Sequence, residues 1–154
     1  MKRSSRFSVA LHVLAHLAEH PAEPSTSESL AACVRTNPVV VRRTLAGLRE
    51  AGLVASAAGH GGGWSLARAP AEITVREVYE ALGERLLIAI DPALHTAGCR
   101  VERAVSGALD DFLADAEAML AERLGRITLA ELSASVRALP ARGTTTDGGG
   151  THVA

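Results

Sequence analysis

Apolar residues recur every three or four positions along the first fifty residues, in segments separated by polar breaks. The first segment runs from Phe7 to Ala18, has Ser4 or Ser5 as an N-cap, and ends near His20, before prolines stop a helix. A second, shorter segment, TSESLAACV, begins with two good N-cap residues and places Leu30, Ala31 and Val34 on one face. The pattern therefore predicts one long helix followed by one short helix.

The segment NPVVVRRTLAGLREAG predicts a third helix. Asn37 is a good N-cap, and Pro38 falls at the first helical position, where its missing N–H costs nothing. The buried stripe is Val41, Leu45 and Leu48, and Gly52 is placed to end the helix. The second and third helices are joined by residues 35–37, which gives a helix-turn-helix, although Arg35 stands where this turn often has glycine.

Two short apolar segments follow, and they predict a β-hairpin. The strands are expected at 53–57 and 64–67, with the glycine-rich tip at 58–63 between them. A phosphate-binding P-loop would end in Gly-Lys-Ser/Thr and lead into a helix, whereas this loop ends in Gly-Trp-Ser and leads into a strand. A hairpin directly after a helix-turn-helix is the wing of a winged helix, with glycines that permit left-handed backbone angles and close approach to a neighbour.

The C-terminal half predicts three more helices. Thr74 caps TVREVYEALG, residues 84–98 are irregular, and a long helix runs from Arg100 to about Arg126. Thr128 and Glu131 form a capping box for a last short helix. The expected divisions are a winged helix at 1–83, a linker or effector loop at 84–99, a dimerisation helix with the short terminal helix at 100–136, and a disordered tail at 137–154.

The long helix carries an apolar stripe that a small winged helix cannot bury alone. A second copy of the chain is the natural partner, and the alternative is that the helix folds back over its own domain. The stripe residues expected at a dimer interface are Val101, Val105, Ala108, Phe112, Ala116 and Met119.

Composition narrows the class of protein. The chain has 154 residues, of which 47% are hydrophobic and only 3% aromatic, so its core is built from Ala, Val and Leu. No apolar run approaches the roughly 20 residues that span a bilayer, and two cysteines do not make a disulfide framework. We therefore expect a soluble cytoplasmic protein without a membrane partner.

Charge is divided unevenly. Residues 1–68 hold eight Lys and Arg against four Asp and Glu, whereas residues 69–154 hold eight against thirteen. A basic half suggests contact with a polyanion, although chance surface charge is the alternative. Paired arginines near the start of a recognition helix can read guanine, and valine can contact a thymine methyl group; on an isolated helix they would be a solvated flank. The expected DNA-contacting residues, including phosphate contacts from basic residues, are Arg3, Arg6, Asn37, Val39, Val40, Arg42, Arg43, His60, Gly61, Gly62 and Arg68.

Other chemistry finds less support in the sequence. His12, His16 and His20 are spaced one helical turn apart, which suits a transition metal, but only His60 or His95 could complete such a site across a dimer. The prediction is therefore no metal and no cofactor. No nucleophile elbow, metalloprotease motif or dinucleotide motif is present, so we do not expect an enzyme.

Taken in order, SSRFSVALHVLAHLA, NPVVVRRTLAGLREAGLV, GHGGGWSLARAP, ITVREVYEAL and ITLAEL resemble the Rrf2-type bacterial transcription regulators over about residues 4–132. The resemblance implies a homodimeric winged-helix repressor or activator with an effector loop before the dimerisation helix. Two departures matter: Ala58 stands where the family often has a basic residue entering the wing tip, and Cys99 is the only cysteine in a segment where cluster-binding members carry three. One thiolate cannot hold an iron–sulfur cluster, so the chain resembles members without one.

The expected function is therefore a homodimeric, sequence-specific DNA-binding regulator, with a mostly helical winged helix-turn-helix fold and an inverted-repeat operator. It is expected to act as a repressor that responds to a redox or small-molecule signal. Cys99, one residue before the long helix, is the candidate sensor thiol, with an inert loop residue beside a small-molecule effector as the alternative; Cys33 is expected to be structural. The rival hypotheses are a metal-responsive sensor using the three histidines and a winged-helix module for protein interaction.

Overall fold

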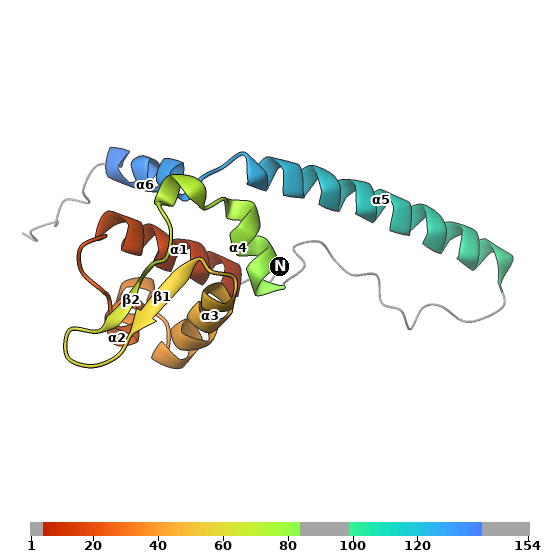
Figure 1. Cartoon of the computed structure of the whole chain (residues 1–154). Helices are drawn as coiled ribbons and strands as arrows, with labels where there is room; N and C mark the ends of the chain where they lie inside the picture. Colours follow the sequence, from red (N-terminus) through yellow and green to blue (C-terminus); the bar gives the residue numbers. More distant parts are fainter. Residues whose placement is uncertain (1–4, 84–98, 140–154) are drawn as a thin grey trace, which may run out of the picture.

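The computed structural model describes residues 5–83 and 99–139. It shows a winged helix-turn-helix body from which one long helix projects (Figure 1). The elements in chain order are α1 (Ser5–Glu19), α2 (Ser27–Val34), α3 (Pro38–Glu50), β1 (Val54–Ala57), β2 (Gly63–Leu66), the 3-10 turn η1 (Pro70–Glu72), α4 (Val75–Leu82), α5 (Arg100–Gly125) and α6 (Leu129–Ala138). The predicted mostly helical fold with a two-stranded hairpin and a long C-terminal helix is confirmed.

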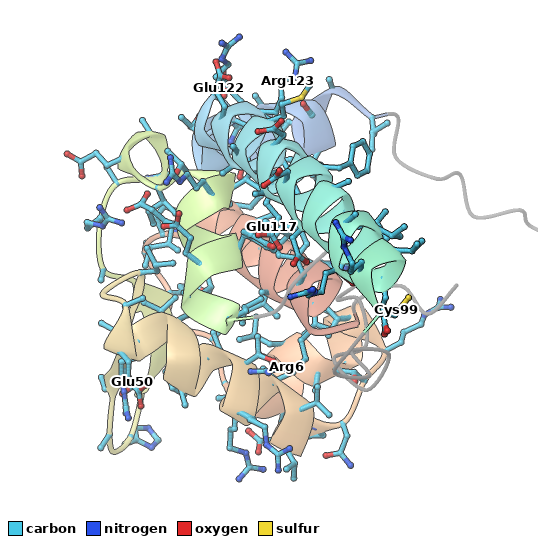
Figure 2. The ribbon with its side chains drawn as sticks, turned by 90° about the vertical axis from the view of Figure 1, so that its right-hand side faces the viewer. Arg6, Glu50, Cys99, Glu117, Glu122 and Arg123 are labelled. Carbon is cyan, nitrogen blue, oxygen red and sulfur yellow. The ribbon has the colours of Figure 1, made fainter. Side chains whose placement is uncertain are left out.

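Helix α1 lies at the centre of the body, between α6 on one side and α2 and α3 on the other (Figures 1 and 2). Its Leu14 packs in one aliphatic core with the α3 stripe of Val41, Leu45 and Leu48, all four with no exposed surface. Burying each such side chain contributes about 1.5–3 kcal/mol. The inward face predicted for α3 is therefore confirmed.

Side-chain caps fix where the helices begin. The Asn37 Oδ1 atom accepts a hydrogen bond from the Val39 N–H at 2.8 Å, so α3 starts at Pro38 as predicted. Thr26, Thr74 and Thr128 cap α2, α4 and α6 in the same way, the last two within capping boxes. Arg35 ends α2 in the left-handed conformation, with φ of 52°. Arginine thus takes the backbone angles for which this turn often uses glycine, at a cost of about 1–2 kcal/mol.

The glycine run of the wing turns the chain and also lets β2 lie close to the segment before α2. Strands β1 and β2 pair antiparallel from Val54–Leu66 to Ala57–Gly63. Trp64 in turn exchanges two backbone hydrogen bonds with Ser25, at 2.9 and 2.8 Å, so the wing is fastened to the segment before α2. A Cβ atom on Gly63 would lie 2.8 Å from the Ser25 carbonyl oxygen. Glycine at this position is therefore what lets the wing lie against the body.

Helix α5 leaves the body and is not folded back over it (Figure 1). None of its residues is buried, and its apolar side chains include Val101, Phe112 and Met119, which are each about 70% exposed. The chain then returns, because Ile127 and Leu129 hydrogen-bond to Val75 and Ile73 at 2.9 and 2.8 Å. Helix α6 packs on α1 and continues to Ala138, two residues into the range expected to be a disordered tail, because its Arg137 pairs with Glu19 of α1 at 2.9 Å.

We expect Gly63→Ala to destabilise the protein by about 1–3 kcal/mol, because the added methyl group must displace the Ser25 backbone. The matched control is Gly107→Ala on α5, where a Cβ atom meets nothing within 4 Å and the free energy of unfolding should rise by about 0.5–1 kcal/mol. Urea unfolding followed by circular dichroism measures both. Equal stability of the two variants would refute the close-approach argument.

Candidate DNA-contacting surface and thiol sites

The first turns of α3 present an exposed face next to their buried one. Val39 is 57% exposed, Arg42 and Arg43 are both exposed, and Val40 is half-buried. Asn37, also a predicted contact, uses its side chain to cap the helix. Because the stripe from Val41 to Leu48 is held in the core, the rotation of α3 is fixed with this face outward.

The carboxylate of Glu28 competes only weakly with a nucleic acid for the guanidinium of Arg42. Its guanidinium lies 3.4 Å from the Glu28 carboxylate of α2, and both side chains are more than half exposed. An exposed pair of this kind is worth at most about 1 kcal/mol. A phosphate or a guanine edge can therefore replace Glu28 as the partner of Arg42.

The predicted wing contacts differ in availability. His60 and Gly61 are exposed at the tip, where Gly61 has a φ of 79°, while Gly62 is half-buried with its backbone against Ala57. Arg68, at the base of the wing, is held by Glu77 of α4 at 2.6 Å. The wing tip is thus more available than the wing base for a contact with a phosphate backbone.

The two basic residues expected near the N-terminus are not equivalent. Arg6 is half-buried on α1, and its Nε atom is shielded from solvent (Figure 2). A guanidinium in this position is less available to a phosphate than those on α3. Arg3 lies outside the described residues, as does the expected effector loop at 84–98.

Glu77 joins the wing to α4. Its carboxylate accepts hydrogen bonds from the Thr74 N–H at 2.8 Å and from Arg68 at 2.6 Å. The pKa of Glu77 is lowered, first by the Thr74 backbone N–H and then, against partial burial, by Arg68 and the Thr74 hydroxyl. This carboxylate therefore stabilises the fold only while it is ionised.

Cys99 caps the beginning of α5, at the end of that helix farthest from the body (Figures 1 and 2). The thiol is fully exposed, and its pKa is lowered by the backbone N–H groups of Glu102 and then Val101. A helix N-terminus favours a negative charge and so favours the thiolate. Cys99 therefore stays a candidate sensor thiol, and the expected effector loop before it lies outside the described residues.

Cys33, which was expected to be structural, is an exposed residue. Its Sγ atom lies 3.6 Å from His12 Nε2 and 3.8 Å from His16 Nδ1. The sequence shows the two histidines on one helix face, but only the packing of α1 against α2 brings the thiol between them. Within residues 5–83 and 99–139, no three His, Cys, Asp or Glu side chains are grouped to hold a metal ion. His60 lies on the wing, and His95 lies outside the described residues.

None of the helices in the described ranges combines the length and the apolar composition that crossing a membrane requires.

The family model named Rrf2, described as an iron-dependent transcriptional regulator, matches residues 3–135 of the chain. YwnA of Bacillus subtilis (strain 168), named as an HTH-type transcriptional regulator, is 36% identical over 108 residues, which are 70% of this chain and 79% of YwnA. Among solved structures, T. potens IscR is 25% identical with a TM-score of 0.69, over 93% of this chain and 94% of IscR. CymR, the global cysteine regulator of B. subtilis, is 24% identical with a TM-score of 0.59, over 88% of this chain and 98% of CymR, and supports the fold alone.

We expect Glu77→Gln to lower the melting temperature near neutral pH, because the neutral amide loses the Arg68 ion pair and the charge-assisted bond from Thr74. The pKa of Glu77 is depressed in the folded state, so its stabilisation is present above the unfolded value of 4.5 and is lost as pH falls through the folded value. The difference from wild type should therefore shrink in acid. Glu80→Gln, which removes only an exposed pair with Arg76, is the control; a pH-independent deficit in Glu77→Gln would contradict the assignment.

Proposed function

Because the chain belongs to the Rrf2 family of helix-turn-helix transcriptional regulators, which bind DNA, we propose that it acts as a homodimeric, sequence-specific repressor. The observation that carries the proposal is the exposed face of α3, where Val39, Arg42 and Arg43 stand beside a capped, rigidly packed helix start. Helix α3 enters the major groove, and the wing tip lies along the phosphate backbone. The family is one of transcription regulators and not of enzymes.

Arg42 and Arg43 are proposed to read base edges. Arginine donates two parallel hydrogen bonds to guanine O6 and N7, and the valines beside it can meet thymine methyl groups. His60 and Gly61 at the wing tip are proposed to position the protein on phosphates without reading sequence. Arg68 contributes less, since Glu77 already neutralises it.

The proposed dimer forms through the apolar stripe of α5, comprising Val101, Val105, Ala108, Phe112, Ala116 and Met119. Apart from half-buried Ala116, these residues are exposed in the single chain. A two-fold arrangement of α5 would bury them and would place two copies of α3 in major grooves about one helical turn apart. The operator is then an inverted repeat.

The signal is proposed to be redox-active or a small molecule. The family description mentions iron, but the donor groups in the described ranges do not fit an iron centre: the two cysteines lie on α2 and at the start of α5. Oxidation of the Cys99 thiolate would act directly at the end of the dimerisation helix.

We expect Arg42→Ala and Arg43→Ala each to weaken operator binding by about 1–3 kcal/mol at particular base pairs. Sites selected from random or genomic DNA supply the operator, and titrations of operator variants at several salt concentrations supply the affinities. Arg76→Ala on α4 is the control for loss of one positive charge away from α3. Equal losses of affinity for operator and random DNA in both arginine variants would contradict base reading.

We expect the double substitution Val105→Asp and Phe112→Asp to convert a dimer into a monomer and to weaken operator binding, because two charges would be buried at the interface. Light scattering should report the chain mass of 16.0 kDa in place of twice that mass. The control introduces the same charges on the opposite face of α5, as Ala114→Asp and Ala118→Asp, both at exposed positions. A monomeric wild type at micromolar concentration would refute the dimer.

A further inference from the structure

A pocket of about 360 Å³ opens between α1, α2 and α6. Its polar side is formed by His12, His16, Glu19 and His20 of α1 and by Cys33 of α2. Its apolar side is formed by Ala15 of α1 and Val136 of α6. Pockets that bind small organic molecules begin at about this size and combine an apolar wall with a few convergent polar groups. The pocket is separate from the α3 face and from the α5 stripe.

The thiol in this pocket is both accessible and paired with a base. Cys33 is exposed, so a small molecule can reach its sulfur atom. The Sγ atom lies within hydrogen-bonding distance for sulfur of two imidazole nitrogens, at 3.6 Å in His12 and 3.8 Å in His16. A thiol beside a neutral imidazole is the arrangement that activates cysteine as a nucleophile.

The environment of His16 favours the neutral form of its imidazole. Its pKa is lowered by partial burial first, and then by the neighbouring histidines, His20 and His12. The rings of His16 and His20 are 4.8 Å apart, which accounts for the first of these two electrostatic effects. A neutral imidazole has a nitrogen lone pair free to accept a proton, as a base must.

We propose that Cys33 is a modification site for small electrophiles of the α,β-unsaturated carbonyl class, with the imidazoles of His12 and His16 as proton acceptors for the thiol. These electrophiles match the site because they are small, largely apolar and soft, like the sulfur they would meet. The consequence for DNA binding rests on the proposed function, whereas the reaction at Cys33 does not.

The reaction is a conjugate addition that needs no other reagent. The thiol proton moves to an imidazole nitrogen, and a sulfur electron pair forms a C–S bond with the β-carbon. The C=C π pair shifts toward the carbonyl group as an enolate, and the imidazolium proton then passes to the α-carbon. No electrons are gained or lost overall, and there is no leaving group.

The adduct would act on α3 through a displacement of α2. This helix buries only Ser27, Leu30 and Ala31, and Cys33 lies four residues before the N-cap of α3. The Thr36 N–H bonds to the Ala31 carbonyl at 3.0 Å, so the turn into α3 is tied to the end of α2. A substituent filling the space between α1 and α2 would displace this turn and lower operator affinity.

The test treats the full-length protein with N-ethylmaleimide, a conjugate acceptor, and follows adducts at Cys33 and Cys99 by peptide mass spectrometry over time. In the double variant His12→Gln and His16→Gln, the rate at Cys33 should fall about tenfold or more, since a positioned base is lost. The rate at Cys99 in the same molecules should stay unchanged and serves as the internal control. Thermal unfolding shows whether the double variant is folded.

DNA binding is then measured before and after treatment. Operator affinity of Cys99→Ser should fall about tenfold or more as Cys33 becomes occupied, while the double variant Cys33→Ser and Cys99→Ser, which has no thiol to label, should keep its affinity. If unmodified wild type selects no DNA sequence, the proposed function fails, and the labelling rates still decide the chemistry at Cys33.

Three results would overturn the proposal. These are an unchanged Cys33 rate in a folded double histidine variant, an operator affinity that Cys99→Ser keeps when its Cys33 is fully occupied, and stoichiometric zinc that is bound through Cys33 in the purified protein. Zinc would be detected by elemental analysis of untagged wild type and Cys33→Ser, and it would make the thiol a metal ligand.

Discussion

The buried stripe of α3 against α1 is the contact on which the proposed DNA-binding surface depends. Val41, Leu45 and Leu48 have no exposed surface and pack in one core with Leu14 of α1. A helix with one face fixed in a core has its opposite face fixed too, so this aliphatic contact decides which side chains point outward. Arg42 and Arg43 follow Val41 directly and therefore fall on the outward side without needing any contact of their own. Asn37 adds the second constraint, because its cap sets where the helix begins.

Helix α5 differs from α3 because its apolar stripe is not buried in a single chain. Helix α3 finds partners for its stripe in α1 and α4, whereas α5 extends beyond the body and leaves its stripe in water (Figure 1). The return of the chain through Ile127 and Leu129 anchors only the C-terminal end of α5. The body is therefore packed without α5, and the apolar stripe of this long helix stays exposed in the single chain.

Local features of the fold could be predicted from the sequence, because each depends on neighbouring residues. The Asn37 cap, the capping boxes at Thr74 and Thr128, and the period of the α3 stripe are contained within a few turns of chain. The pairing of Arg68 with Glu77 and the approach of Gly63 to Ser25 join different elements, so spacing alone gave no sign of either.

The two thiol sites also differ in whether neighbouring residues or tertiary packing determine them. Cys99 follows from its place before a predicted helix, and its lowered pKa is an effect of that helix end. Cys33 looked structural because it neighbours Val34 in an apolar segment, and only the packing of α1 on α2 shows it to be exposed between two imidazoles.

Helix α2 is the element through which a small chemical change would reach α3, the proposed recognition helix. It has eight residues, and its hold on the core comes mainly from Leu30 and Ala31. Isolated helices this short are not stable in water, so its position depends on those few tertiary contacts. Elements with few buried contacts are the first to shift when conditions change. Helix α3 has its full stripe buried and is held more firmly in the core than α2. A chemical change at α2 therefore shifts the position of α3 relative to the wing more readily than a change within α3 does.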